Sequence, residues 1–304
     1  MPMPMSVVPS RLHAWVELIR PPNLFTAPGD ALAGFFLAAG LAGHVDLSRA
    51  IFPALAALFL YVGGLIGNDV ADTEEDSRDR PGRPIPSGRV SRRAAFGAAV
   101  GWAVLGLLIV LPVGLPAFGL ACLTQLSVMI YNGWLKRYAV PGAIAMGACR
   151  GFSFLMGVAA AQPQLLGAPP ILAAAVGIVL YIAGVTWIAD RETVAERIGP
   201  RRWIPLLSLA LALPLVVALT HKLELPFLVL GVLAIGWAFC QAWRIRGIPS
   251  RPVLGSAIGN LIRGLLLIQA AFCSLAGWPG LAVAVGLLVA WPLSAAIAKR
   301  FVAT

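Results

Sequence analysis

The chain of 304 residues is 59% hydrophobic and 12% charged, and its mean hydropathy is +0.86. This composition excludes an ordinary soluble domain of the same length and indicates that a lipid bilayer surrounds most of the chain. The net charge of +10 could indicate nucleic-acid binding, but the basic residues lie mainly in alternate connections between apolar segments. That distribution follows the positive-inside rule of membrane proteins, so we expect no nucleic-acid partner.

Ten apolar stretches follow one another along the chain, and each is close to the roughly 20 residues that a helix needs to cross a bilayer. They cover residues 23–43, 50–69, 94–112, 115–133, 141–160, 169–189, 203–220, 226–243, 253–276 and 279–298. The sequence therefore predicts an all-α fold, a polytopic transmembrane bundle of nine to ten helices. We expect this bundle to form one domain over residues 1–304.

Two connections between these stretches are long, polar and charged, at residues 68–90 and 186–202. Most of the lysines and arginines lie in these connections, near the two ends of the chain, and in short turns on the same side. By the positive-inside rule that side is cytoplasmic. We therefore expect a multi-pass protein of the cell membrane whose active site faces the cytoplasm.

The first of these connections holds six of the protein's 13 acidic residues within positions 69–79. If the preceding helix continues, Asn68, Asp72 and Asp76 recur at every fourth position and share one face. Oxygen ligands in that arrangement suit Mg2+, which completes its shell with water and phosphate oxygens. The arginines that follow supply donors for phosphate. The alternative interpretation is a solvated charged loop that binds nothing.

A resemblance to the UbiA family of membrane prenyltransferases is carried by this segment, which reads N-D-x-x-D-x-x-x-D and then R-P-I-P-S-G. The resemblance implies that Asn68, Asp72 and Asp76 hold Mg2+ on a prenyl diphosphate. It also implies that Asp69 supports the metal site and that Arg83 belongs to an anion-binding loop. The implied fold is the membrane helix bundle of that family.

The family's second signature is an Asp-x-x-x-Asp pair after the sixth span, and the corresponding segment here departs from it. Asp190 has Val194 four positions later, whereas Glu192 and Glu196 restore a carboxylate pair at that spacing. The resemblance implies a second metal site in which Glu192 is the expected catalytic ligand, with Asp190 and Glu196 as further candidates. The alternative is that these acids form ion pairs with neighbouring arginines.

Four more residues are candidates for binding the substrate. Tyr131 and Lys136 resemble the family's Tyr-x-x-x-Lys segment with one additional residue between them, which implies contact with the diphosphate. Asn23 ends an Arg-Pro-Pro-Asn segment that resembles the family's opening motif, which implies a place beside the substrates. Arg150 lies inside an apolar span, where an ionisable group is costly and is a functional candidate by default. The alternative for Lys136 and Arg150 is anchoring at the membrane interface.

These resemblances imply an enzyme that uses Mg2+ to move an isoprenyl group from an allylic prenyl diphosphate to a small or lipophilic acceptor, with release of diphosphate. The changed second signature is similar to the EboC-type branch of the family, which implies a small polar acceptor such as a cyclitol. A phosphatidyl-alcohol transferase is disfavoured, because its Asp-Gly-x-x-Ala-Arg motif is absent from the sequence. The alternative from another class is a transporter or carrier with cation-binding acidic loops. The acids lie at span ends rather than at the midplane, where transporter coupling sites usually lie, and this favours the enzyme.

Overall fold

The computed structural model describes residues 11–190 and 197–301. In these residues the regular secondary structure is helical, without strands. Ten helices are long and apolar enough to cross a membrane. This finding confirms the predicted all-α bundle. For the described part of the chain the number of candidate spans is ten, the larger of the two expected numbers.

The helices in chain order are α1 (Arg11–Ile19), α2 (Pro21–Leu24), α3 (Ala27–Ala42), α4 (Leu47–Ala71), α5 (Thr73–Asp79), α6 (Arg92–Ile109), α7 (Leu115–Gly133), α8 (Ala139–Ala161), α9 (Pro169–Ala189), α10 (Ile204–Thr220), α11 (Leu225–Arg244), α12 (Arg251–Ser274) and α13 (Gly277–Phe301). Short 3-10 segments cover Leu111–Val113, Leu135–Arg137, Pro163–Leu165 and Gly199–Trp203. The long helices coincide with the predicted spans to within a few residues, because the apolar length that a bilayer requires is visible directly in the sequence.

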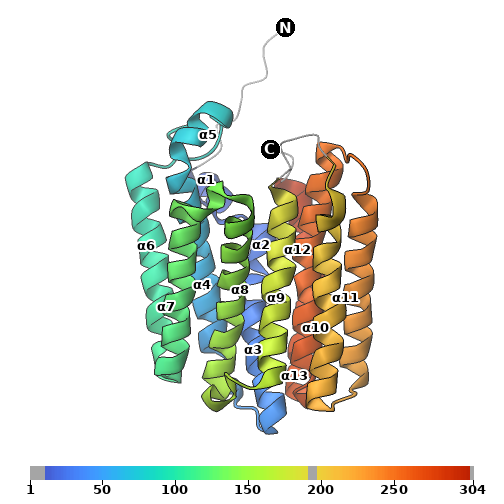
Figure 1. Ribbon diagram of the computed structural model, residues 1–304. Helices are drawn as coiled ribbons and strands as arrows, with labels where there is room; N and C mark the ends of the chain where they lie inside the picture. The colour runs from blue at the N-terminus through green and yellow to red at the C-terminus, as the bar shows by residue number, and fades with distance from the viewer. Residues whose placement is uncertain (1–10, 191–196, 302–304) are drawn as a thin grey trace.

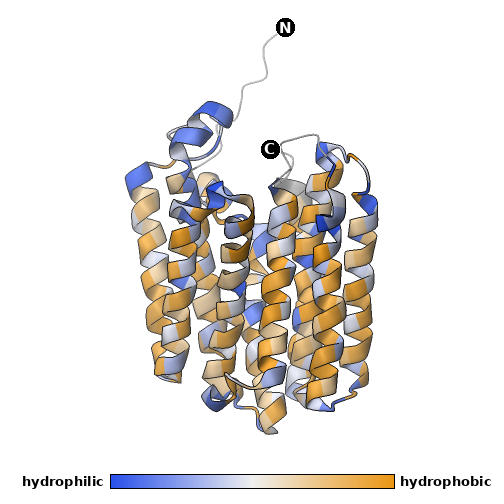
Figure 2. Ribbon diagram, viewed as in Figure 1, coloured by the Kyte–Doolittle hydropathy of each residue, from blue (hydrophilic) through white to orange (hydrophobic). Residues whose placement is uncertain are grey.

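The long helices stand side by side in one bundle, and most neighbours in the chain pack against each other (Figure 1). The spans formed by α3, α8 and α12 are the most enclosed, whereas α6, α7 and α13 turn most of their apolar side chains outward. Figure 2 shows apolar residues along the sides of the bundle and hydrophilic residues at α5. An apolar outer surface suits contact with lipid, so α3, α8 and α12 form the interior of a membrane-embedded bundle.

Glycines let α3 and α8 approach each other closely. A Cβ atom on Gly34 would lie 1.9 Å from the carbonyl oxygen of Phe154, and one on Gly157 would lie 1.8 Å from that of Ala31. A larger residue at either position would therefore push the two backbones apart. Small residues have this role at many helix contacts in membranes. The contact fixes the relative position of two helices that each carry a buried charged residue.

Candidate active site

The acidic segment lies where α4 passes into α5, at the same end of the bundle as α1 (Figure 1). Although α4 ends at Ala71 and α5 begins at Thr73, helical hydrogen bonds continue across the junction. Asp72 N donates to Asn68 O over 2.9 Å, and Asp76 N donates to Asp72 O over 2.8 Å. The segment therefore stays close to a continuous helix, and the helical repeat sets the directions of its side chains.

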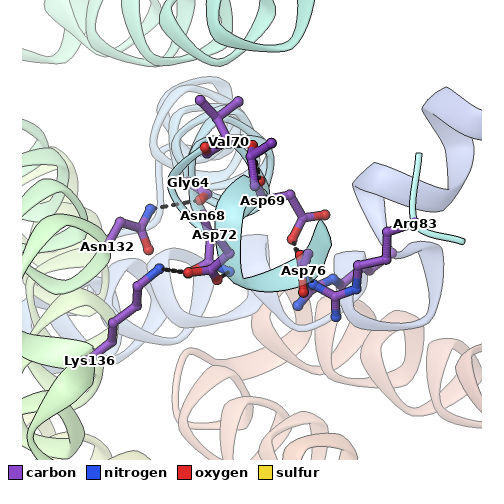
Figure 3. A network of polar contacts seen from close by, with 11 residues as sticks. Gly64, Asn68, Asp69, Val70, Asp72, Asp76, Arg83, Asn132 and Lys136 are labelled. Carbon is purple, nitrogen blue, oxygen red and sulfur yellow. Dashed lines mark hydrogen bonds and ion pairs between the residues drawn. The ribbon is translucent and has the colours of Figure 1, made fainter. Parts of the chain in front are cut away.

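Asn68 and Asp72 face the end of α7 (Figure 3). Asn68 Nδ2 donates to Asp72 Oδ2 over 2.9 Å. Lys136 Nζ donates to Asn68 Oδ1 over 3.4 Å and also contacts Asp72 Oδ1. Asn132 Nδ2 donates to Gly64 O over 2.9 Å and ties α7 to α4 beside them. An ammonium group thus lies between two oxygen atoms on this face.

Asp69 and Asp76 are buried on a different face, on the side of Arg83 (Figure 3). Arg83 Nη1 donates to Asp76 Oδ2 over 2.7 Å and lies 3.7 Å from Asp69 Oδ1. Arg20 Nη2 donates to Asp69 Oδ1 over 2.6 Å. These ion pairs join the α1–α2 junction and the loop after α5 to the end of α4.

The arrangement differs from the expected single face for Asn68, Asp72 and Asp76. Each step of four residues turns a helix by about 40° beyond a full turn, so two steps displace the last side chain by about 80°. Seven residues make nearly two full turns, which places Asp76 on the face of Asp69 instead. In the structure Asn68 and Asp72 therefore share Lys136 as a partner, whereas Asp76 pairs with Arg83.

A cavity of about 160 Å³ adjoins the Asn68 face between α4, α7 and α8. Its polar lining includes Asn68 at the rim, the tyrosines Tyr61 and Tyr131, and Arg150 of α8. The apolar part of the lining includes Leu65, Val128 and Met146. The cavity therefore joins a charged rim to a mostly apolar interior.

A second hollow of about 460 Å³ lies on the Arg83 face. Its lining includes Arg20, Arg80 and Arg83 together with Asp69 and Glu17. Arg20 also lines the smaller cavity. Three guanidinium groups thus line one hollow at the rim, and Arg20 belongs to both spaces.

The remaining predicted site residues differ in how far the structure describes them. Tyr131 lines the cavity, and Asp190 directly follows the last residue of α9. Asn23 of α2 lies close to Tyr61, which lines the same cavity. Glu192 and Glu196 lie outside the described residues.

Sequence reasoning missed two buried polar residues that lie against Arg150. Asp30 of α3 and Gln269 of α12 have no exposed surface, and both are in contact in the interior. The signal was present, because an acid inside an apolar span is as costly as the arginine that was singled out. Sequence reasoning also left unassigned Arg20, which holds Asp69.

The oxygen atoms on the Asn68 face suit a hard divalent cation. One is the amide oxygen of Asn68 and the other belongs to the Asp72 carboxylate, and the Lys136 ammonium lies between them. In the described ranges, no group of three or more His, Cys, Asp or Glu side chains is placed to hold a metal ion. Two protein oxygens are consistent with Mg2+, which usually keeps several waters and phosphate oxygens in its shell.

The fold and the rim define a class of protein: an integral multi-pass membrane protein with a charged mouth above a partly apolar cavity. The model of the UbiA prenyltransferase family matches residues 31–252, which is more than half of the chain. The chain therefore belongs to the UbiA prenyltransferase family.

Several relatives of this chain share the name digeranylgeranylglyceryl phosphate synthase. The digeranylgeranylglyceryl phosphate synthase of Methanothrix thermoacetophila is 35% identical over 153 residues, which are 50% of this chain and 57% of that protein. The synthase of the same name from Ignicoccus hospitalis is 30% identical over 255 residues, covering 79% of this chain and 80% of that one. The match thus spans little more than half of the first relative and four fifths of the second.

A solved structure supports the fold independently. The UbiA homolog from Archaeoglobus fulgidus bound to DMAPP and Mg2+ superposes with a TM-score of 0.60 at 17% identity. The superposition covers 87% of this chain and 99% of that one. At this identity the likeness establishes a shared fold.

Proposed function

We propose that this protein is a Mg2+-dependent prenyltransferase that moves an isoprenyl group from an allylic prenyl diphosphate to an acceptor hydroxyl. The observation that carries the proposal is the rim, where Arg20, Arg83 and Lys136 each pair with a carboxylate beside a partly apolar cavity. Cations suit the diphosphate, and the apolar space suits the isoprenoid chain. The metal-bearing face is that of Asn68 and Asp72.

Asn68 and Asp72 would hold the metal on one side, and Asp190, Glu192 and Glu196 are the candidates on the other. When bound, Mg2+ supplies positive charge that neutralises the leaving diphosphate. Asp69 and Asp76 have a supporting role in the proposal, because they hold the rim arginines rather than facing Lys136. In this proposal Asp76 lies outside the first metal shell to which the sequence analysis assigned it.

The side chains of the rim bind and orient the diphosphate. Lys136, Arg83 and Arg20 reach it from two faces of α4, and their charges stabilise the negative charge that develops on it as the allylic carbon–oxygen bond breaks. The bonding electron pair leaves with the diphosphate. The acceptor oxygen forms the new bond to carbon, and its proton passes to water or diphosphate at the rim.

The cavity wall protects the allylic carbon from water. Leu65, Val128 and Met146 present apolar surface, and the rings of Tyr61 and Tyr131 close the space beside them. Exclusion of water strengthens the electrostatic interactions and prevents hydrolysis of the allylic group. Tyr131 and Asn23 have positioning roles next to the substrate in this proposal.

We propose a glycerol-based lipid as the acceptor class. The relatives are named for the synthesis of a prenylated glyceryl phosphate, and the alignment with the Ignicoccus protein covers 80% of its length. A lipid acceptor also suits a cavity embedded among membrane helices. A small polar acceptor such as a cyclitol, which the resemblance to the EboC-type branch implied, is the competing outcome of the experiment.

The active site faces the cytoplasm in this proposal. The support is the distribution of charge, because Arg20, Arg83 and Lys136 belong to the basic connections that the positive-inside rule places there. The described residues at the opposite ends of the spans include few basic side chains, Arg49 and Lys222 among them. Labelling of cysteines introduced at Ser77 and at Gln164, in intact cells with a membrane-impermeant reagent, tests the orientation.

Transfer is tested with the purified full chain in detergent. The protein is supplied with labelled geranylgeranyl diphosphate, Mg2+ and geranylgeranylglyceryl phosphate, and released diphosphate and lipid mass are measured together. We expect equal amounts of diphosphate and of a lipid heavier by one isoprenyl chain. A cell extract in place of the glyceryl lipid identifies another acceptor class. A transporter would release no diphosphate under any of these conditions, and that result would refute the proposal.

A further inference from the structure

Three buried polar side chains from different helices meet in the interior of the bundle. Arg150 Nε of α8 lies 2.6 Å from Asp30 Oδ2 of α3. Gln269 Nε2 of α12 donates to Asp30 Oδ1 over 2.7 Å. Arg150 Nη2 and Gln269 Nε2 both donate to Thr26 O, each over 2.9 Å. The guanidinium is thus held by one carboxylate and one carbonyl, and both of these are shared with the amide of Gln269.

The helices around this group leave its side chains little freedom. A Cβ atom on Gly29 would lie 2.0 Å from Gln269 Oε1, so the amide lies directly against the α3 backbone. The close contact of α3 with α8 through Gly34 and Gly157 fixes the other side. A guanidinium anchored to such rigid neighbours keeps one orientation, as a preorganised binding group requires.

Arg150 alone of these three side chains reaches the cavity that begins at Asn68. Its side chain is 11% exposed, whereas that of Asp30 is completely buried. Nε of Arg150 lies in the ion pair with Asp30, and Nη2 donates to Thr26 O. In the described part of the chain no hydrogen bond is made by Nη1. A guanidinium has five N–H donors, so the edge that carries Nη1 has donors left for a ligand in the cavity.

The charge of this group determines which ligand atom it suits. An isolated arginine inside a membrane is costly, and Asp30 offsets that charge at contact distance. The pair is therefore nearly neutral as a whole and has little attraction for a second negative charge. At the rim, by contrast, the side chains of Arg20, Arg83 and Lys136 are between 19% and 36% exposed. Arg20 and Arg83 also line one hollow together with Arg80. The diphosphate belongs at the rim, and an uncharged oxygen suits the interior.

We propose that Asp30 and Gln269 are positioning residues, which hold Arg150 so that its free edge binds an uncharged oxygen, hydroxyl or ether, of the acceptor lipid. The proposal rests on the proposed function in taking the acceptor to be a glycerol-based lipid. It assigns acceptor recognition to the inner part of the cavity and diphosphate binding to the rim. Arg150 touches the acceptor, and the other two residues act through it.

The test measures binding separately from turnover. The probes are 1-O-geranylgeranylglycerol, a neutral glycerol ether, and geranylgeranyl diphosphate with Mg2+, each titrated against the full chain in detergent by intrinsic fluorescence. The variants are Asp30→Asn, Arg150→Gln and the double variant. Matched controls are Asp46→Asn and Arg49→Gln at the far end of α4, which remove the same charges away from the cavity. Thermal unfolding of every variant is measured alongside.

We expect each of the three variants to weaken binding of the ether by about tenfold or more, because a charge-assisted hydrogen bond is lost. Affinity for the diphosphate should stay within about threefold of that of the unmodified protein. Asp30→Asn alone should lower the unfolding temperature, because it leaves a buried arginine unpaired. The double variant should recover that temperature without recovering ether binding, since the guanidinium is gone. A purely structural role predicts recovery of both.

Three results would overturn the proposal: normal ether affinity in the double variant, equal loss of both ligands, or no binding of the ether by the unmodified protein. Failure of the proposed function is a separate observation, namely that the unmodified protein releases no diphosphate from the prenyl substrate. A protein that binds the ether through Arg150 and yet releases no diphosphate would retain the binding site and lose the proposed reaction.

Discussion

The Lys136 ammonium contacts the Asp72 carboxylate and donates to Asn68 Oδ1 over 3.4 Å, so it occupies the position between two oxygens that a metal ion would share. A divalent cation held by Asp72 and Asn68 would compete with the ammonium for the same oxygen atoms. In the proposed function, Lys136 would then be available to bind the diphosphate. The ion pair would in this way couple metal binding to the assembly of the diphosphate site.

The first prediction follows from that competition. Lys136→Met removes the competing cation, so the variant should bind Mn2+ or Mg2+ more tightly than the unmodified protein when no substrate is present. The same change removes a cation from the diphosphate site and should weaken binding of geranylgeranyl diphosphate by roughly tenfold or more. Calorimetric titration gives both affinities. Arg137→Met, the adjacent basic residue, is the control, and a lower metal affinity in Lys136→Met would contradict the exchange.

The second prediction concerns removal of the metal. Diphosphate release should cease in excess EDTA and return with Mg2+, because the charge on the leaving group is then no longer neutralised. The unfolding temperature should change little, since Asp72 keeps Lys136 as its partner in the absence of metal. Asp72→Asn should lower turnover by about 100-fold or more at saturating Mg2+, a typical loss for one electrostatic catalytic group. Full activity in EDTA would remove the metal from the reaction.

A third prediction separates Asp76 from Asp72. The Asp76 carboxylate is buried and pairs with Arg83, so Asp76→Asn leaves a half-buried guanidinium short of one partner. We expect weaker binding of the diphosphate and a lower unfolding temperature, with metal affinity in the absence of substrate nearly unchanged. Asp72→Asn should give the reverse, with metal affinity lost and stability kept. Loss of metal affinity of equal size in both variants would restore the single-face arrangement.

The contrast between these two aspartates shows how far the sequence was sufficient. The spans were predictable because each must supply a long apolar run, and the pair Asn68 and Asp72 was predictable from a spacing of one turn. The pairing of Asp76 with Arg83 was not predicted, because the small mismatch between four residues and one helical turn accumulates over two steps. The contact between Asp30 and Gln269 was not predicted, because the two residues are 239 positions apart in the chain. Hydropathy identifies spans without indicating which of them are neighbours.

The last prediction tests the helix contact that holds the interior site. Gly157→Ala places a methyl group 1.8 Å from the carbonyl oxygen of Ala31 by the geometry of the backbone, so α3 and α8 must separate. Overpacking of this kind costs roughly 1–3 kcal/mol. The unfolding temperature should fall, and the separation should also displace Arg150 from Asp30, so affinity for the neutral ether should fall more than affinity for the diphosphate.

Gly101→Ala is the matched control, because a Cβ atom there meets nothing within 4 Å. Since alanine favours a helix more than glycine does, the control should be as stable as the unmodified protein or slightly more so. An unfolding temperature for Gly157→Ala equal to that of the control would contradict the close contact, and with it the rigid support that we infer for Arg150.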